Sequence, residues 1–147
     1  MVDMRCLGAA VLLVLAATAC TARNERGAPP DVAAPPADAL RTPSGLSSKV
    51  LRVGLGSIHP GPNSTVTVHY TGWTTNGQMF ESSVTDGKPI TGPVDQFIAG
   101  WVEGLQLMRV GEKRRFWIPG TLAYDKNPMP GAPTGMLVFD IELIRVR

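Results

Sequence analysis

Two kinds of hydrophobic periodicity follow one another after residue 47, and together they indicate a small α+β domain. Residues 65–71 (TVTVHYT) alternate strictly and are rich in β-branched side chains, which predicts a half-buried strand. Asn76-Gly77 is the dipeptide most typical of a tight hairpin, so residues 78–82 are expected to form the returning strand. Further strands are expected at residues 50–53, 112–119 and 137–143. In the last strand four apolar residues share a face: Leu137, Phe139, Ile141 and Leu143.

One segment has helical periodicity instead. Apolar residues at spacings of three and four predict a helix over residues 97–108, weakened by Gly100 and Gly104 and ended by Gly111. Residues 84–94 and 127–135 are rich in Gly and Pro and are predicted to be loops. Strands outnumber helices and are joined by hairpins. We therefore expect an α+β fold in which a twisted antiparallel β-sheet, a half-barrel, wraps around one short α-helix.

The first 19 residues have the pattern of a secretory signal peptide. Met4-Arg5 precedes an apolar run that ends in the small residues Ala17-Thr18-Ala19, directly before Cys20. The run is shorter than the ~20 apolar residues that span a bilayer. Removal of residues 1–19 and export of the remainder are therefore predicted.

Cys20 resembles the lipid-accepting cysteine of a bacterial lipobox, because small residues stand immediately before it. The alternative is ordinary signal cleavage that leaves a free thiol. An exposed, unpaired thiol is a liability in an oxidising compartment, and this favours a lipid on Cys20. We expect an anchor outside the cytoplasm in a bacterial cell envelope. Thr21 is not the aspartate that retains bacterial lipoproteins at an inner membrane, so the periplasmic side of an outer membrane is preferred.

Residues 20–44 differ in composition from the rest of the chain. Ala, Pro and charged residues dominate, with two Pro-Pro pairs and almost no large apolar side chains. Such a segment cannot offset the entropy of ordering, so we expect a disordered tether, or a leftover linker of the same appearance. The folded domain is then expected to comprise residues 45–147.

Composition and charge exclude several classes of function. The formal net charge of +2 is too small to favour nucleic acid as a partner. Both cysteines, Cys6 and Cys20, precede the domain, which must therefore be stable without an internal disulfide. His59 and His69 have no cysteine near them and make no convincing metal site. The densest basic cluster, residues 113–115, is expected to be a solvated strand end or turn.

Five short motifs, in this order, resemble the FKBP family of peptidyl-prolyl cis-trans isomerases. They are residues 68–72 (VHYTG), 80–83 (FESS), 100–104 (GWVEG), 118–124 (IPGTLAY) and 137–143 (LVFDIEL). Each motif alone is weak evidence, because an aromatic residue at strand or helix spacing is usually a core residue. The order of all five indicates an FKBP-like domain over about residues 45–147.

The resemblance implies a role for individual residues. Trp101 matches the indole that forms the floor of the proline pocket, and Glu81 takes the place of the usual pocket aspartate. Tyr124 matches the tyrosine whose hydroxyl binds a peptide carbonyl, and the Ile98 backbone N–H is expected to bind another. The apolar walls are expected to be Tyr70, Phe80, Phe97, Ile98 and Phe139. No metal or other cofactor is required for this chemistry.

The expected function is isomerisation of X-Pro bonds in exported polypeptides, with proline-containing chains as partners. The alternative is a non-catalytic module, tethered to the membrane, that binds proline-containing peptides or acts as a chaperone. A purely structural envelope lipoprotein is a poorer third possibility, because so many pocket-type aromatic residues are present. The Pro-rich loop at residues 125–135 is short for the family, which predicts weak binding of macrolide inhibitors.

Overall fold

The computed structural model describes residues 27–147. The predicted signal peptide and the predicted lipid site at Cys20 lie outside this part of the chain. Within residues 27–147 no helix is both long and apolar enough to cross a bilayer.

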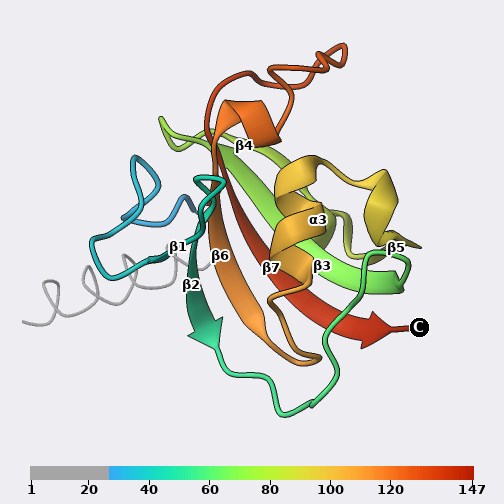
Figure 1. The fold of residues 1–147 in the computed structure, drawn as a ribbon. Coiled ribbons are helices and arrows are strands. Elements are labelled where there is room, and N and C mark those ends of the chain that lie inside the picture. The colour runs from blue at the N-terminus through green and yellow to red at the C-terminus, as the bar shows by residue number, and fades with distance from the viewer. Residues whose placement is uncertain (1–26) are drawn as a thin grey trace, which may run out of the picture.

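One antiparallel sheet organises the described residues (Figure 1). Its strand order is β1-β2-β6-β7-β3-β4, and β5 pairs with β3 beside β4. The strands are β1 (Leu40–Arg41), β2 (Ser47–Arg52), β3 (Thr65–Thr74), β4 (Met79–Ser82), β5 (Ile90–Pro93), β6 (Lys113–Ile118) and β7 (Leu137–Val146). The helical elements are α2 (Ser83–Asp86), α3 (Ala99–Leu105) and two 3-10 turns, η1 (Val94–Gln96) and η2 (Gly120–Leu122). The strands curve around α3, which confirms the predicted α+β half-barrel.

The core lies between α3 and the inner face of the sheet. The two long central strands, β3 and β7, pair so that Tyr70 stands opposite Ile141 and Gly72 opposite Phe139. Alternation gives each strand one buried face, as predicted. The four apolar residues predicted to share a face of β7 are all 2% exposed or less: Leu137, Phe139, Ile141 and Leu143.

Helix α3 is shorter than predicted, spanning Ala99–Leu105 instead of residues 97–108. Phe97 and Ile98 have extended backbone conformations, so the chain enters the helix only after them. The two glycines of α3 let it approach β6 closely. A Cβ at Gly100 would lie 2.5 Å from Ile118 Cγ2, and one at Gly104 would lie 2.6 Å from Phe116 Cε1. Glycine costs the helix about 0.5–1 kcal/mol per site, and here it permits the contact on which the core depends.

The prediction of a loop at residues 84–94 is wrong, because this stretch contains most of helix α2 and strand β5. Ser82 Oγ accepts a hydrogen bond from the Thr85 backbone and begins α2, which Gly87 ends in a left-handed conformation at φ +72°. Strand β5 follows and pairs with the first half of β3, while β4 pairs with the second half. Its four residues include a glycine and a proline at the strand end, which hid the strand from pattern analysis.

The prediction of a disordered tether over residues 20–44 is wrong for residues 27–44, which are ordered. We call residues 27–44 the N-terminal strap. Strand β1 pairs with β2, and Asp31 Oδ1 lies 2.9 Å from Arg115 Nη1. The Trp117 indole N–H also donates to the Asp31 carbonyl over 2.9 Å. The strap has few large side chains of its own, but Arg115 and Trp117 on the sheet bind it. The composition of the strap could not reveal these contacts, because the residues that make them lie elsewhere in the sequence.

The basic cluster at residues 113–115 is also not a solvated strand end. Arg114 is 9% exposed and forms an ion pair with Glu112 at 2.5 Å. Arg115 makes two hydrogen bonds to the Asp140 carboxylate, of 2.6 and 2.9 Å, in addition to its contact with the strap. These charges therefore hold strands and strap together.

Candidate functional site

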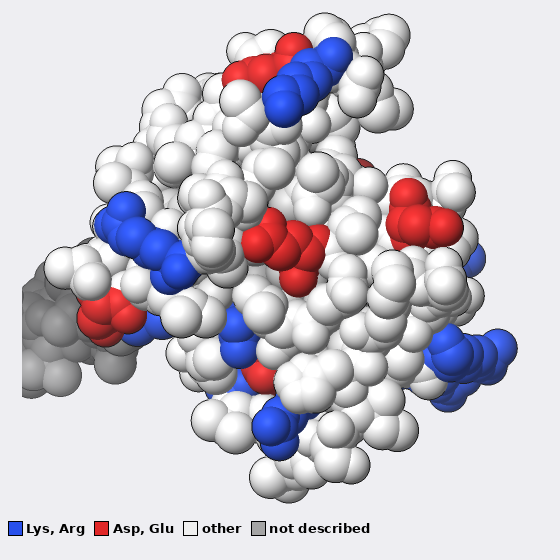
Figure 2. All heavy atoms as spheres, in the orientation of Figure 1, with Lys and Arg blue, Asp and Glu red and all other residues white. Residues whose placement is uncertain are grey.

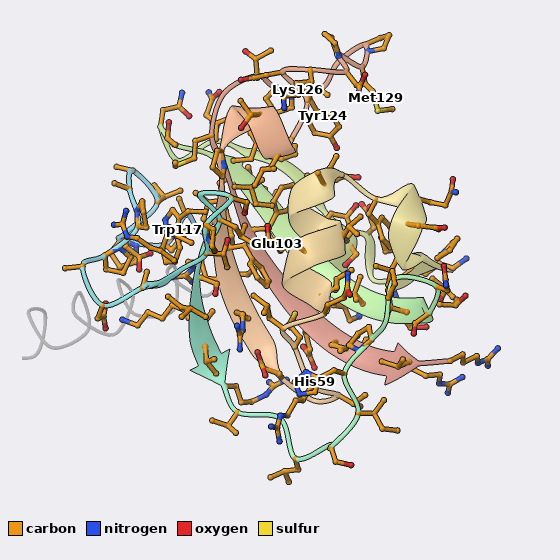
Figure 3. All side chains as sticks on the ribbon, viewed as in Figure 1. His59, Glu103, Trp117, Tyr124, Lys126 and Met129 are labelled. Carbon is orange, nitrogen blue, oxygen red and sulfur yellow. The ribbon has the colours of Figure 1, made fainter. Side chains whose placement is uncertain are left out.

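An apolar cavity of about 210 Å³ opens between the start of α3 and the sheet. Side chains from β3, β4, β5, β7, η1, α3 and the loops beside them form its wall: Tyr70, Glu81, Ile90, Gln96, Phe97, Ile98, Trp101, Tyr124, Met129 and Phe139. Figure 3 shows Tyr124 and Met129 together at one end of the molecule, near the start of α3. The cavity is smaller than the ~300–1,000 Å³ of sites for drug-sized ligands, so it fits a small ring better than a large molecule.

Trp101 forms the floor of this pocket. Its side chain is 4% exposed and is surrounded by three other rings. Tyr70 and Phe139 meet it nearly at right angles, with centroids 5.1 and 5.4 Å away, and Phe97 is tilted at 5.0 Å. Edge-to-face contacts of this kind hold rings in fixed orientations. The Trp101 indole nitrogen is buried and has no hydrogen-bond partner among residues 27–147.

A second ring pair supports the pocket wall from behind. Phe80, on β4, packs edge-on against Phe139 with the centroids 5.5 Å apart. Both rings lie against Gly72, where a Cβ would come within 2.7 Å of Phe139 and 2.8 Å of Phe80. The glycine of the VHYTG motif is therefore required by the packing of these two rings.

The Tyr70 hydroxyl donates a hydrogen bond of 2.5 Å to Glu81 Oε1. Tyr70 is buried on β3, whereas Glu81 lies on the edge strand β4 and is exposed. Burial raises the pKa of Tyr70 well above its ordinary value, and the bond to the Glu81 carboxylate raises it further. The hydroxyl therefore stays protonated and fixes the ring at the pocket wall.

Tyr124 follows η2 and is half-buried at the pocket rim. Burial raises the pKa of its hydroxyl, and the negative charge of Glu81 adds to this effect. Residues 27–147 offer this hydroxyl no hydrogen-bond partner, which leaves a neutral donor at the rim.

The backbone carbonyl of Ile98 is already used by the first turn of α3. It accepts hydrogen bonds from the Trp101 and Val102 N–H groups over 2.9 and 3.0 Å.

The loop after Tyr124 is tied at its base. Asp125 Oδ1 accepts a hydrogen bond of 2.8 Å from the Gly135 backbone, which closes the Pro-rich segment between them. No residue other than glycine has a positive φ between residues 27 and 147, so Asp125 carries no left-handed strain. Met129, within this loop, reaches the pocket wall.

The structure brings seven of the eight expected pocket residues to the cavity: Tyr70, Glu81, Phe97, Ile98, Trp101, Tyr124 and Phe139. Phe80 is the exception, because it contacts Phe139 behind the wall and does not line the cavity. Ile90, Gln96 and Met129 also line the cavity and were not predicted from the sequence. Their segments were predicted as loops or lay outside the motifs, and only the apolar character of Ile90 and Met129 offered a signal.

Residues 56–144 match the family described as FKBP-type peptidyl-prolyl cis-trans isomerase. The chain belongs to this family. It is 45% identical over 106 residues to the FKBP-type isomerase FkpA of Aeromonas hydrophila, covering 71% of this chain and 39% of the relative. It is 43% identical over 107 residues to the outer membrane protein MIP of Legionella longbeachae, covering 71% of this chain and 46% of the relative.

Similarity to FKBP proteins extends to their solved structures and to a shorter relative. The crystal structure of FkpA from Escherichia coli superposes with a TM-score of 0.71 at 37% identity, covering 76% of this chain and 53% of that one. The FK506-binding protein 1 of Candida glabrata is 42% identical over 106 residues, which are 69% of this chain and 93% of the relative. The chain thus spans under half of the FkpA and MIP sequences and nearly all of the compact FKBP.

Proposed function

We propose that this FKBP domain catalyses the cis–trans isomerisation of X-Pro bonds in polypeptides outside the cytoplasm. The observation that carries the proposal is the buried Trp101 at the floor of a small apolar cavity, with Tyr70 and Phe139 edge-on around it. A proline ring is a small apolar group that such a cavity can enclose. Membership of an isomerase family supports the same activity.

The physical basis is the electronic change in the amide during rotation. A planar X-Pro bond resists rotation with a barrier of ~18–20 kcal/mol, because its C–N bond has partial double-bond character. At the twisted midpoint this resonance is lost and the amide becomes less dipolar. An apolar pocket favours the twisted state relative to water, and only such differential binding accelerates the reaction. Each tenfold increase in rate requires about 1.4 kcal/mol of preferential stabilisation of the twisted state.

Two donors would hold the peptide while the bond turns. The Tyr124 hydroxyl, neutral and unpartnered within residues 27–147, would bind one peptide carbonyl. The Ile98 backbone N–H, at the start of α3, would bind another. Glu81 positions Tyr70 through their hydrogen bond, and Phe80 supports the wall by packing on Phe139. Phe97 completes the wall beside Trp101.

The location we propose is the bacterial cell envelope, with a lipid on Cys20 after removal of residues 1–19. The apolar run before Cys20 supports export, and the resemblance to a protein named as an outer membrane protein is consistent with it. Residues 27–44 form the strap, so at most seven residues separate the proposed anchor from the folded unit. At up to about 3.5 Å per residue, a chain of this length reaches no further than ~25 Å, whatever its conformation, so the domain would stay near the bilayer surface.

Macrolide inhibitors are expected to bind this FKBP pocket only weakly. The cavity volume of about 210 Å³ is below that of a drug-sized site, and the short Pro-rich loop beside it is tied at its base by Asp125.

The test is an isomerase assay on the signal-processed chain, by protease coupling or NMR exchange, with a series of Ala-X-Pro-Phe peptides. Faster isomerisation than in buffer is expected for at least part of the series. Folded protein that binds these peptides and leaves every rate at the uncatalysed value would assign the pocket to a non-catalytic binder. The anchor is checked separately by mass spectrometry, which should find a diacylglycerol on Cys20.

A further inference from the structure

Three large aliphatic side chains project from the loop between β2 and β3. Val53 is 75% exposed, Leu55 is 99% exposed and Ile58 is 61% exposed, and we call these three residues the apolar tip. Single exposed aliphatic residues are common on protein surfaces, but three within six residues of one loop are a local concentration. The isomerase pocket does not use them.

The backbone of this loop contacts a neighbouring turn, and these contacts fix the direction in which the tip points. Gly54 and Gly56 lie against the turn at residues 109–112. A Cβ at Gly54 would lie 2.6 Å from both the Val110 carbonyl oxygen and the Glu112 nitrogen. The Gly56 N–H donates to the Val110 carbonyl over 3.2 Å. With both neighbours pressed against this turn, the side chain of Leu55 is directed outward.

Two arginines lie beside the apolar tip. Arg52 precedes it in the chain, and Arg109 belongs to the turn that the two glycines contact. The acidic residues nearby are already paired: Glu112 with Arg114 at 2.5 Å and Glu142 with Arg52 at 2.9 Å. Arg109 is exposed and forms no ion pair with any residue in the range 27–147. In the view of Figure 2 the lower end of the molecule, which carries this loop, is mostly uncharged, with a basic group on the front just above it.

The apolar tip lies at the opposite end of the domain from the pocket. Figure 3 shows His59, next to Ile58, at the lower end, and Tyr124 and Met129 at the upper end. A surface bound through the tip would therefore leave the pocket open to polypeptides in solution.

We infer that the apolar tip and Arg109 form a contact surface for an anionic lipid bilayer. Aliphatic side chains would enter the headgroup boundary and Arg109 would bind anionic headgroups, as in interfacial membrane binding. Three side chains offer far less than the ~800 Å² per partner of a stable protein interface, which disfavours a second copy of the chain. The inference builds on the envelope location proposed above, which keeps the domain near a bilayer.

The test measures how residues 20–147, produced without residues 1–19 and carrying Cys20→Ser, partition onto vesicles, so that no lipid anchor contributes. Vesicles of phosphatidylcholine are compared with vesicles that also contain phosphatidylglycerol, by co-sedimentation. We expect binding to the anionic vesicles. Leu55→Asp should lower the partition coefficient about tenfold or more, because one buried leucine is lost. Arg109→Gln should lower it about fivefold, on anionic vesicles only.

Met129→Asp is the matched control, because Met129 is another exposed apolar residue, 61% exposed, but lies at the pocket end. Its partition should equal that of the Cys20→Ser parent. Equal losses in Leu55→Asp and Met129→Asp, or no binding to anionic vesicles, would overturn the inference. So would concentration-dependent dimerisation that Leu55→Asp abolishes, since it would assign the tip to a second copy. Leu55→Asp should keep the parental kcat/KM, and this separates failure of the membrane surface from failure of the isomerase proposal.

Discussion

The 2.5 Å hydrogen bond from the Tyr70 hydroxyl to the Glu81 carboxylate joins a central strand to an edge strand at the pocket wall. Tyr70 in turn meets Trp101 edge-on, with ring centroids 5.1 Å apart. An exposed carboxylate thus fixes the orientation of a buried ring. Glu81 contributes to the site by positioning Tyr70.

The Tyr70–Glu81 bond predicts strong non-additivity between two substitutions. Tyr70→Phe and Glu81→Ala should each lower kcat/KM about two- to tenfold, because a hydrogen bond to a charged group contributes ~1.5–3 kcal/mol and Glu81 is partly screened by water. The double variant should be no worse than the poorer single variant. The measurement is a double-mutant cycle: kcat/KM for peptide isomerisation by the wild type, the two single variants and the double variant. Fully additive losses would show that the two residues act independently.

Tyr124→Phe should fold normally and isomerise more slowly. The substitution removes only a hydroxyl that makes no side-chain hydrogen bond within residues 27–147, so the denaturation midpoint should not change. Loss of a neutral hydrogen bond worth ~0.5–1.5 kcal/mol predicts a two- to tenfold drop in kcat/KM. A variant with the wild-type kcat/KM would remove Tyr124 from the peptide-binding groups.

Trp101→Leu should separate the catalytic role of this indole from its structural role. Trp101→Ala is expected to cost about 3–5 kcal/mol of stability, because a large buried side chain is lost. Leucine keeps part of the apolar volume but not the flat floor, so Trp101→Leu should remain folded and lose most activity. Calorimetry and the peptide assay are measured on the same samples. Wild-type rates in folded Trp101→Leu would make Trp101 a core residue only.

Alkaline pH should destabilise the fold through its two pocket tyrosines. Burial raises the folded-state pKa of Tyr70 and Tyr124 above the ordinary value of 10.0. Well below pH 10 both tyrosines are protonated in the folded and unfolded chains, and they contribute no pH dependence. Above pH 10 the unfolded chain releases these protons first, so the free energy of unfolding should fall as pH rises. Urea unfolding from pH 8 to 11 measures the slope, which Tyr70→Phe should reduce; an unchanged slope would contradict the raised pKa of Tyr70.

The N-terminal strap should contribute measurable stability. Asp31→Ala removes an ion pair to Arg115, which is only 14% exposed, and should cost about 1 kcal/mol in urea unfolding. Asp38→Ala is the matched control, because its partner Lys49 is 40% exposed and Asp38 itself 68% exposed. That loss should be under about 0.5 kcal/mol. Equal values for the two variants would mean that the strap is not held through Asp31.

The long central strands were predictable from sequence because their pattern is set by burial on one face. Residues 65–71 and 137–143 alternate as half-buried strands must, and the structure buries their expected faces. Strand β5 was not predictable in this way. It is short, carries Gly92 and Pro93, and exists because the first half of β3 offers it an edge.

Most of the pocket followed from the order of five motifs, whose roles came from resemblance to a family. Periodicity alone could not distinguish Trp101 on the pocket floor from an ordinary core residue. The structure added Ile90 and Met129, which come from segments with no periodic pattern. It also showed that Phe80 stands behind the wall, a distinction that depends on the packing of two rings over Gly72.

By itself the sequence determined the fold class, the central strands and the family, because local periodicity and motif order are properties of the chain alone. Only the tertiary structure decided the extent of α3 and whether residues 27–44 are ordered. The glycines of α3 weaken an isolated helix, yet they allow its contact with Ile118 and Phe116. The strap has too few large apolar side chains to fold alone, yet Arg115 and Trp117 hold it against the sheet. In both cases the deciding free energy belongs to a contact between segments far apart in sequence, which no local pattern records.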